Sequence, residues 1–394
     1  MVRLNMTDRS YTVEDVPERY KRLGGRGLTS TLIHAEVDPQ CHPLGPHNKL
    51  VFAPGIITGT SAPTSARVSV GGKSPLTGGI KESNAGSGWA PSLAKMGIKA
   101  VVVEGQGAAD DGYWTAHIAL ADGKPKVTFM SADDYTGKNL FDVFPDVFGK
   151  FGDNVHVAGV GTAGEFGYPN SGIVFNDMKK RPTRYSGRGG LGAVMGSKRL
   201  KFIVIDPTDG PGVDIANEEL FKAGRQKMRE ALMEHAITKP KGGLNTYGTA
   251  ILINILNEAG GLPTRNFRDG RFEGAADIAG EAIFETNKKR MGKEIYNHNC
   301  SPGCIIQCSN TLYSEEGEEI ASCIEYESDW AFGADCGIDD LDAIGEMVTL
   351  CNGYGLDTIE AGVTLGVAMD SGMLEFGDAA GAFIVSGSDD SNRG

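Results

Sequence analysis

The sequence lacks several features that would place it at once in a well-defined class of protein. No apolar stretch reaches the length of about 18 residues that suggests a membrane-spanning helix, and the N-terminus carries no apolar signal segment. Positive charge is also scarce, because 38 Lys and Arg side chains stand against 51 Asp and Glu side chains, for a formal net charge of −13. A broad nucleic-acid interface needs a basic face. We therefore expect neither a membrane nor a nucleic-acid partner.

Cysteine is nearly absent from the first three quarters of the chain, where Cys41 stands alone. The other six of the seven cysteines lie between residues 300 and 351. An odd number distributed so unevenly does not fit the disulfide framework of a secreted protein. We therefore expect a reducing, cytoplasmic location for this chain of 394 residues, whose length predicts two or three domains.

Glycine, by contrast, is abundant, with 56 of the 394 residues. A glycine-rich run covers residues 58–88 and contains a single arginine, Arg67, and a single asparagine, Asn84. Glycine admits close backbone approach, and Ser or Thr hydroxyls with free N–H groups can bind anions. A helix predicted at Trp89–Met96 would point its first N–H groups back at this run. A ligand-free series of strands and hairpins is an equally good interpretation of the composition alone.

A second glycine-rich run, Arg184–Lys198, again combines arginines with glycines. Its string GRGGLG matches GxGxxG from Gly187. The dinucleotide-binding motif of this form requires a strand directly before it, and no clear apolar strand precedes the string here. We therefore do not expect a Rossmann-type site.

The order of predicted elements indicates an α+β fold with two domains. Short strands are predicted near residues 2–6, 50–53, 100–104, 114–120, 126–129 and 155–160, and helices near 13–22, 28–37, 89–96 and 140–148. Helices dominate later, near residues 218–233, 247–259 and 339–351. We expect a β-rich domain over residues 1–208 and a mainly helical domain over residues 209–394, joined at PTDGPG, residues 207–212.

Three cysteines in the second half have a spacing that favours metal binding. Cys300, Cys304 and Cys308 recur every four residues, and thiolates this close bind soft metals well. The alternative is three small buried residues on one helix face, which Pro302 and Gly303 disfavour because they interrupt a helix. Zinc would need a fourth ligand, such as His298 or another cysteine.

Three longer strings together resemble the first domain of the aldehyde ferredoxin oxidoreductase family. They are LGGRGLTS (23–30), APGIITGTSAPTSARVSVGGKSPLTGGIKESNAG (53–86) and SGRGGLGAVMGSK (186–198). Members are tungsten enzymes with a bis-pterin cofactor and an iron–sulfur cluster. The resemblance implies that the first domain is a β-rich saddle beneath two pterins, with tungsten or molybdenum as the metal.

The resemblance also assigns cofactor-binding residues. Family positions that contact the pterin phosphates, or the Mg²⁺ that bridges them, match Arg67, Asn84, Gly86, Arg184, Tyr185 and Gly187. The planar donor fork of arginine suits phosphate, and the carbonyls of Asn84 and Tyr185 are the oxygen ligands that magnesium favours. Later, NGYGLD (352–357) resembles the pterin-binding DxxGLD motif, so that Leu356 and Asp357 match while Asn352 replaces an aspartate.

In the second half of the chain, the resemblance implies which metal centre the three cysteines would bind. Cys300, Cys304 and Cys308 would be ligands of a [4Fe–4S] cluster, although the family spacing CxxCxxxC is one residue shorter in its first interval. The core EYESDWAFGA places Glu327 at the family glutamate near tungsten, where a carboxylate can orient water or aldehyde and move a proton. Glu346 matches one ligand of a metal that bridges subunits in some members, but Thr349 replaces the histidine. We therefore do not expect that site.

The function implied is the oxidation of a small aldehyde to a carboxylic acid, with ferredoxin as electron acceptor. The resemblance ends near Ala379, and the family's third domain has no counterpart in the sequence. The alternative is therefore a non-catalytic or split-enzyme fragment that binds pterin or an iron–sulfur cluster. A separate third-domain polypeptide would complete it, and a homodimer also stays open.

Overall fold

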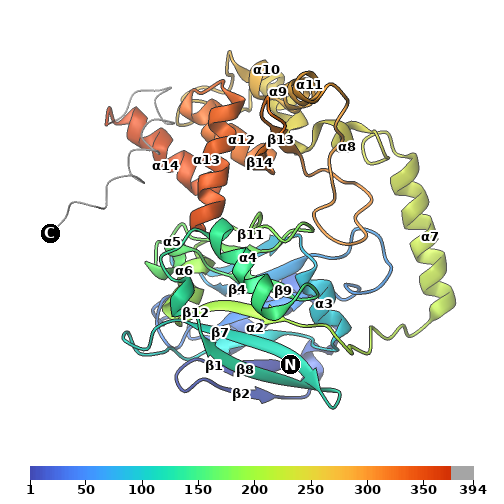
Figure 1. Cartoon of the computed structure of the whole chain (residues 1–394), viewed down its shortest axis with the longest axis vertical. Helices are drawn as coiled ribbons and strands as arrows, with labels where there is room; N and C mark the ends of the chain where they lie inside the picture. Colours follow the sequence, from blue (N-terminus) through green and yellow to red (C-terminus); the bar gives the residue numbers. More distant parts are fainter. Residues whose placement is uncertain (374–394) are drawn as a thin grey trace. The chain divides into compact units, whose positions relative to one another are not determined.

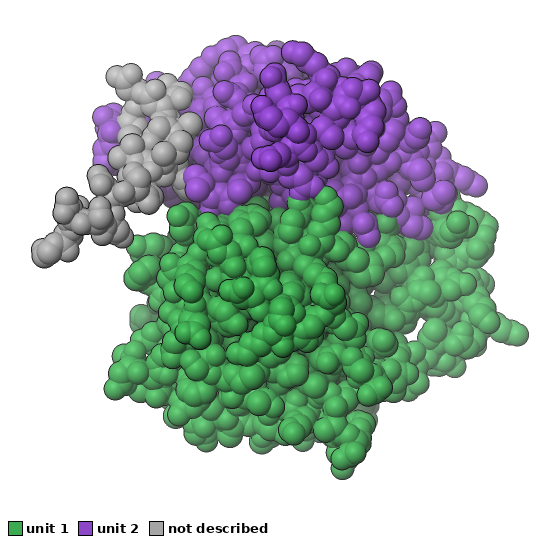
Figure 2. All heavy atoms as spheres, in the orientation of Figure 1, with its two compact units in different colours: residues 1–230, 300–304, 352–357 green, residues 231–299, 305–351, 358–394 purple. Residues whose placement is uncertain are grey.

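The computed structural model describes residues 1–373, which fall into two compact units (Figures 1 and 2). Unit 1 contains residues 1–230 together with two short distant segments, 300–304 and 352–357. Unit 2 contains residues 231–299, 305–351 and, of the described residues, 358–373. The predicted α+β class, β-rich first and mainly helical afterwards, is confirmed. The predicted domain boundary at residue 208 stays a prediction, and the point near Ala379 where the resemblance ends lies outside the described residues.

Unit 1 contains two six-stranded sheets. The first has the strand order β2-β1-β6-β3-β4-β5 and the second the order β11-β10-β9-β12-β7-β8. The first sheet consists of β1 (Val2–Asn5), β2 (Ser10–Val13), β3 (Leu50–Pro54), β4 (Val68–Lys73), β5 (Ile80–Ala85) and β6 (Val101–Glu104). The second consists of β7 (Trp114–Ala121), β8 (Lys124–Ser131), β9 (His156–Gly159), β10 (Ile173–Phe175), β11 (Arg184–Ser186) and β12 (Leu200–Ile205).

Helices fill the connections of unit 1. They are α1 (Glu18–Lys21), α2 (Gly25–Glu36), α3 (Trp89–Lys95), η1 (Asp133–Tyr135), α4 (Leu140–Phe151), α5 (Thr162–Glu165), α6 (Leu191–Ser197) and most of α7 (Glu218–Glu234). The helix predicted over residues 13–22 is wrong in its first half, because Val13 pairs with Val2 in the β1–β2 ladder. Only α1 remains helical in that stretch.

Alternating strand residues build three buried clusters that give unit 1 four layers. Val101 and Val103 of β6 join a core between the two sheets, whereas Val102 packs with α2 on the outer face. Phe202 of β12 likewise packs with α4 on the outer face of the second sheet. Because both faces of these strands are buried, they read as continuous apolar runs in the sequence.

The second glycine-rich run begins with a short strand. This strand, β11, directly precedes GRGGLG, and α6 begins within the string. Because β11 has only three residues, Arg, Tyr and Ser, it is not the apolar strand whose absence we noted in the sequence. In addition, β11 pairs antiparallel with β10, so the string does not open the parallel βαβ unit that a dinucleotide-binding motif requires.

Unit 2 is mainly helical, with one small hairpin. Its elements are α8 (Gly243–Tyr247), η2 (Thr249–Ile251), α9 (Leu252–Ala259), α10 (Ala275–Ile278), α11 (Gly280–Met291), β13 (Thr311–Tyr313), β14 (Glu319–Ser322), α12 (Tyr326–Phe332), η3 (Ala334–Cys336), α13 (Leu341–Tyr354, as far as residue 351) and α14 (Thr358–Asp370). The helix predicted over 247–259 is broken at Gly248, whose φ of 67° cannot continue a right-handed helix. Within residues 1–373, no helix has both the length and the apolar character needed to cross a membrane.

The close packing of α5 against α6 predicts that glycine is required at position 196. A Cβ on Gly196 of α6 would overlap the backbone carbonyl of Gly164 in α5, whereas a Cβ on Gly149 of α4 would meet nothing within 4 Å. We therefore expect Gly196→Ala to lower the free energy of unfolding by about 1–3 kcal/mol through overpacking. The matched change Gly149→Ala should raise it by roughly 0.5–1 kcal/mol, because alanine is the better helix former. Urea unfolding of both variants measures this, and changes of the same sign would contradict it.

Candidate functional site

Most of the predicted cofactor-binding residues gather within unit 1. The edge strands β5 and β11 of the two sheets lie side by side, which brings the two glycine-rich runs together. The segments 300–304 and 352–357 pack onto the same unit. The structure therefore collects the following predicted residues in one unit: Arg67, Asn84, Gly86, Arg184, Tyr185, Gly187, Cys300, Cys304, Leu356 and Asp357.

Arg67 is held at the surface by the strand beside it. It precedes β4 and is exposed. Its Nε donates to Asn84 Oδ1 and its Nη2 donates to the Asn84 carbonyl at 3.2 Å. Asn84 is in turn fixed by a 3.1 Å bond from its Nδ2 to Ser69 Oγ, its cross-strand partner. A guanidinium has five N–H donors, so the exposed Arg67 retains further donors that could bind an anion.

Arg184 is buried, and the turn before it is fixed by one carboxylate. Asp177 accepts the backbone N–H groups of Lys179 and Arg181 at 2.8 Å, and it also accepts Arg181 Nε at 2.9 Å and Thr183 Oγ1 at 3.0 Å. Burial acts to raise the pKa of Asp177, but the N–H and the positive charge of Arg181 outweigh it and the pKa is lowered. Asp177 therefore holds the turn that leads into β11. We did not single it out from the sequence, although an Asp before a short polar turn is a known turn signal.

Cys300 lies directly against Gly86. A Cβ on Gly86 would come within 2.8 Å of Cys300 Sγ, so the contact requires glycine. The pKa of the Cys300 thiol is lowered to about 5. A hydrogen bond from the Cys304 thiol is the largest cause, and the positive charges of Arg184 and Arg67 add to it against the opposing effect of burial. Cys300 is thus suited to be a thiolate, the form of cysteine that ligates metals.

The segment 352–357 lies against the second glycine-rich run. Tyr185 donates its hydroxyl proton to the backbone carbonyl of Asn352. Leu356 forms an isolated bridge with Ser171. The buried Asp357 comes next, and an added Cβ on Gly187 would lie 3.5 Å from its Oδ1. Tyr185, Gly187, Leu356 and Asp357 thus lie close together in unit 1.

Two predicted residues, Glu327 and Cys308, belong to unit 2. Glu327 stands in the first turn of α12 and is half-buried, as is Cys308. Within residues 1–373, no three or more His, Cys, Asp and Glu side chains are grouped in a way that could hold a metal ion. The roles of Glu327 and of the three cysteines therefore stay predictions.

The predicted anion site at the start of α3 is wrong. The backbone N–H of Trp89 donates to Ser87 Oγ at 3.1 Å, and Gly88 packs so closely against the His156 imidazole that a Cβ there would overlap the ring. Burial lowers the pKa of His156 to about 4, so the ring is neutral near pH 7. The protein's own side chains thus occupy the space where an anion was expected.

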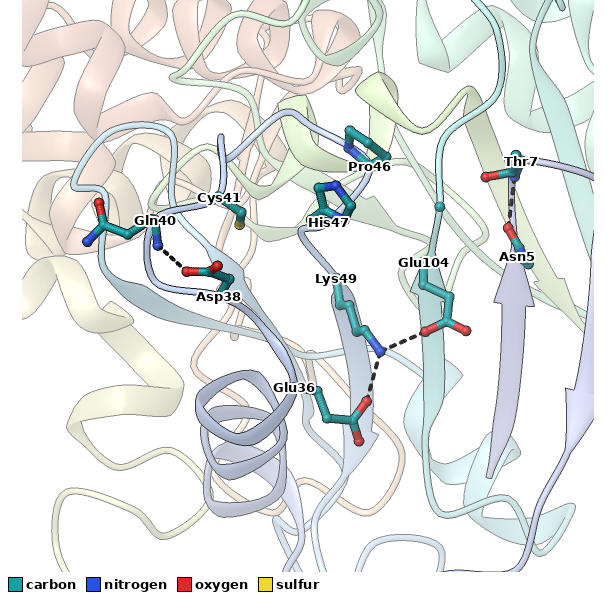
Figure 3. A pocket seen from close by; sticks show the side chains of 11 residues that line it. Asn5, Thr7, Glu36, Asp38, Gln40, Cys41, Pro46, His47, Lys49 and Glu104 are labelled. Atoms are coloured by element: carbon teal, nitrogen blue, oxygen red, sulfur yellow. Dashed lines mark hydrogen bonds and ion pairs between the residues drawn. The ribbon is translucent and has the colours of Figure 1, made fainter.

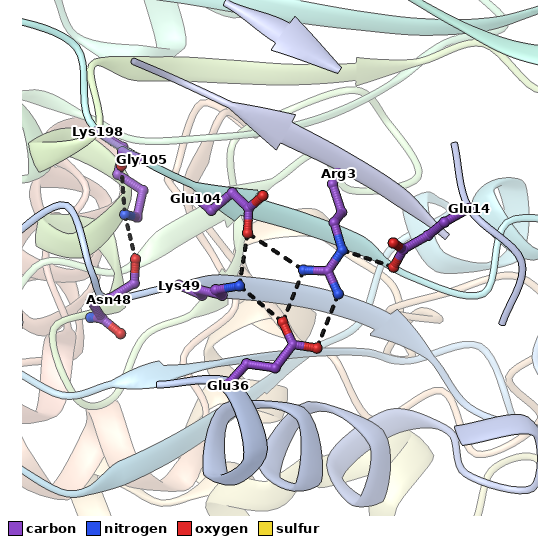
Figure 4. A network of polar contacts seen from close by, with 8 residues as sticks. All are labelled: Arg3, Glu14, Glu36, Asn48, Lys49, Glu104, Gly105 and Lys198. Atoms are coloured by element: carbon purple, nitrogen blue, oxygen red, sulfur yellow. Dashed lines mark hydrogen bonds and ion pairs between the residues drawn. The ribbon is translucent and has the colours of Figure 1, made fainter. Parts of the chain in front are cut away.

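Unit 1 also has a polar pocket of about 540 Å³ that contains no predicted site residue (Figure 3). It is lined by Asn5, Thr7, Glu36, Asp38, Gln40, Cys41, Pro46, His47, Lys49, Glu104 and Gly105. Lys49 bridges Glu36 at 2.9 Å and Glu104 at 2.8 Å, and Arg3 binds both carboxylates from the other side (Figure 4). These charges are matched within the protein, which favours a structural role for the network.

Two family models match the chain. Aldehyde ferredoxin oxidoreductase, N-terminal domain, matches residues 1–207, and Aldehyde ferredoxin oxidoreductase, domains 2 & 3, matches residues 223–383. The tungsten-containing aldehyde ferredoxin oxidoreductase of Thermococcus kodakarensis is 38% identical over 392 residues, covering 96% of this chain and 60% of that protein. Its namesake from Pyrococcus abyssi is 37% identical over 373 residues, covering 94% and 58%. The chain therefore spans less than two thirds of the length of these relatives.

A solved structure has the same fold. The active site complex BamBC of benzoyl coenzyme A reductase, in complex with 1,5-dienoyl-CoA, aligns with a TM-score of 0.76 at 22% identity. The alignment covers 100% of this chain and 57% of that one.

The Asp177 turn generates a prediction with a pH dependence. Because the folded pKa of Asp177 lies below its ordinary value of 3.8, its ionised form stabilises the fold above about pH 4, and this contribution is lost as the pH falls through the folded pKa. Asp177→Asn should therefore lower the free energy of unfolding by about 1.5–3 kcal/mol at pH 7 and by clearly less at pH 3.

The control for this prediction is Asp153→Asn, which removes the 89% exposed partner of Lys180. It should change stability by less than about 0.5 kcal/mol at either pH. Urea unfolding at pH 7 and at pH 3 measures both variants. If Asp177→Asn lowers the free energy of unfolding equally at the two pH values, Asp177 is not ionised in the folded protein.

Proposed function

Because the chain belongs to the aldehyde ferredoxin oxidoreductase family, we propose that it takes part in the oxidation of an aldehyde to a carboxylic acid with a tungsten bis-pterin cofactor. Ferredoxin would accept the electrons. The observation that carries this proposal is the gathering of Arg67, Arg184 and Cys300 in unit 1, where both guanidinium charges act on one thiol. Such a site can hold an anionic cofactor beside a thiolate-bound metal centre.

The residues present fit the phosphates of a pterin cofactor. Arg67 offers exposed donors, and Arg184 adds a buried positive charge close by. We propose that these arginines bind the phosphates, that Asn84 and Tyr185 supply oxygens to the bridging Mg²⁺, and that Gly86 and Gly187 allow close approach. Leu356 and Asp357 would contact the pterin itself. Molybdenum in place of tungsten would require the same protein contacts.

The cysteines fit a redox centre in part. The Cys300 and Cys304 thiols already share a hydrogen bond, and we propose that Cys308 joins them to hold a [4Fe–4S] cluster. None of the seven cysteines, all of which lie among the described residues, forms a disulfide, in keeping with our proposal of a reducing cytoplasm. A second copy of the chain, or a separate third-domain polypeptide, is proposed as an assembly partner.

Glu327 is our proposed acid–base residue. The overall reaction converts an aldehyde and water into a carboxylic acid, two protons and two electrons. Tungsten would supply Lewis acidity and accept the electron pair. A carboxylate oxygen of Glu327 would orient the aldehyde or water and take up one proton, and its half-buried place in the first turn of α12 keeps it accessible to solvent.

Metal and pterin analysis of protein purified without oxygen tests the proposal. We expect tungsten or molybdenum, with pterin fluorescence appearing on denaturation. The absence of both would contradict the proposed cofactor. Cofactor together with iron, but without aldehyde oxidation, would favour the non-catalytic or split-enzyme alternative.

The two arginines generate the next prediction. Arg67→Ala and Arg184→Ala should each weaken pterin retention by about tenfold or more, because each removes a charge-assisted bond of roughly 1.5–3 kcal/mol to a phosphate. Arg184→Lys keeps the charge but loses the planar fork, so its loss should be intermediate. Pterin content per folded chain is the measurement. Arg229→Ala, on the exposed face of α7, is the control, and equal pterin in all variants would show that the phosphates bind elsewhere.

Gly86 generates a separate prediction about iron. Gly86→Ala should displace Cys300, since the new Cβ would lie 2.8 Å from Sγ. We expect iron per chain after anaerobic reconstitution to fall by about half or more. Gly79→Ala lies in the same glycine-rich run, where the nearest atom to a new Cβ is 3.8 Å away, and it should leave iron unchanged. Parental iron content in Gly86→Ala would remove Cys300 from the set of ligands.

A further inference from the structure

One turn in unit 2 has a left-handed backbone at consecutive residues. Three consecutive residues that are not glycine, Arg265, Asn266 and Phe267, have φ values of 46°, 54° and 60°. L-residues adopt this region only rarely and usually singly. Such conformations persist where surrounding contacts determine them fully, and they cluster at functional sites.

The backbone of this turn is bound by the segment just after α12. Side chains of the turn bind elsewhere: Arg265 pairs with Glu273, and Asn266 Nδ2 and Arg268 Nη1 donate to the Asp370 carboxylate. The N–H of Arg265 donates to the Ala334 carbonyl at 3.0 Å and that of Asn266 to the Asp335 carbonyl at 3.2 Å. The N–H of Phe267 donates to Asp335 Oδ1 at 3.3 Å. Any residue at position 335 would supply the backbone carbonyl, so only the bond to Phe267 depends on the aspartate side chain.

Burying the carboxyl group of Asp335 at this position costs folding free energy. It is fully buried, and Gly366 of α14 packs against its carboxyl group, since a Cβ there would lie 2.7 Å from Oδ2. Among the described residues, Asp335 Oδ2 has no hydrogen-bond partner. Burial raises the pKa of this carboxyl to about 6. A buried carboxyl with one unsatisfied oxygen disfavours folding.

The turn is connected to α12 through an aromatic pair. The Phe267 ring is 60% exposed and meets the Trp330 ring edge-to-face, with centroids 5.9 Å apart and an interplanar angle of 73°. Trp330 follows Glu327 by three residues on α12, so the two side chains lie on the same side of the helix. A continuous series of contacts therefore leads from Asp335 through Phe267 and Trp330 to the helical turn that carries Glu327.

We propose that Asp335 is a positioning residue for Glu327: its side chain holds the left-handed turn, and the Phe267 ring held by that turn fixes Trp330 and α12. The proposal rests on the proposed function only for the role of Glu327. The coupling between the turn and the helix requires no cofactor, so it can be measured on the chain itself.

Fluorine NMR of the chain labelled with 5-fluorotryptophan measures the coupling between the left-handed turn and α12, because Trp330 lies on that helix. The chain has three tryptophans, Trp89, Trp114 and Trp330, and a Trp330→Phe variant assigns the third signal. Asp335→Ala removes the acceptor of the Phe267 N–H. We expect the Trp330 signal to shift or broaden while the other two stay in place. Trypsin cleavage after Arg265 and Arg268 should also rise by about tenfold or more as the turn opens.

Matched variants separate positioning from general stability. Asp335→Asn keeps a carbonyl oxygen for the Phe267 N–H and should restore both the parental Trp330 signal and the resistance to trypsin. Asp277→Ala, which removes an exposed carboxylate of α10, should change neither. Phe267→Ala keeps Asp335 and breaks the aromatic contact, so it should move the Trp330 signal even if Asp335→Ala fails to fold.

Two results would overturn the proposal. The first is an unmoved Trp330 signal in folded Asp335→Ala or in Phe267→Ala, and the second is an Asp335→Asn variant that behaves like Asp335→Ala. In the cofactor-loaded enzyme, Asp335→Ala should lower kcat by about tenfold with little change in KM, and Asp335→Asn should recover it. If the protein holds no tungsten or molybdenum, the proposed function fails, while the NMR and trypsin measurements still decide whether Asp335 positions α12.

Discussion

The contact between Gly86 and Cys300 is the constraint on which the candidate site depends. It joins the glycine-rich run of the first sheet to a segment more than 200 residues later in the chain, and it tolerates no side chain at position 86. Once Cys300 is placed there, a hydrogen bond from the Cys304 thiol and then the charges of Arg184 and Arg67 lower the pKa of its thiol to about 5. The close approach therefore keeps Cys300 within reach of both arginine charges, whose effect weakens with distance.

The sequence predicted those parts of the site that depend on local residue type. Arg67, Arg184 and the glycines around them stand in two distinctive runs, and their convergence in unit 1 agrees with the family motifs. Local patterns failed where distant residues decide the outcome. The N-terminus of α3 looked open to an anion, but His156, far along the chain, packs against it. Asp177 was missed because its importance lies in four hydrogen bonds that no composition reveals.

Burial also separates acidic residues that look alike in the sequence. Glu327 and Asp329 are two residues apart on α12, yet Glu327 is half-buried while Asp329 is completely buried, with neither carboxylate oxygen hydrogen-bonded among the described residues. Burial raises the pKa of Asp329 well above its ordinary value. Of this pair, only Glu327 is accessible to solvent. The family motif selects the same residue on independent grounds.

Similarity of fold alone does not decide the chemistry of this protein. The benzoyl coenzyme A reductase complex has the same architecture at 22% identity, and one fold can support different reactions. The chemistry therefore depends on particular residues, and the two units contribute different ones. Unit 1 holds the arginines and glycines suited to an anionic cofactor, whereas unit 2 holds Glu327 and the strained turn near it. The proposed cofactor binding and the proposed proton transfer thus depend on separate sets of contacts, so that substitution should be able to remove either while the other is retained.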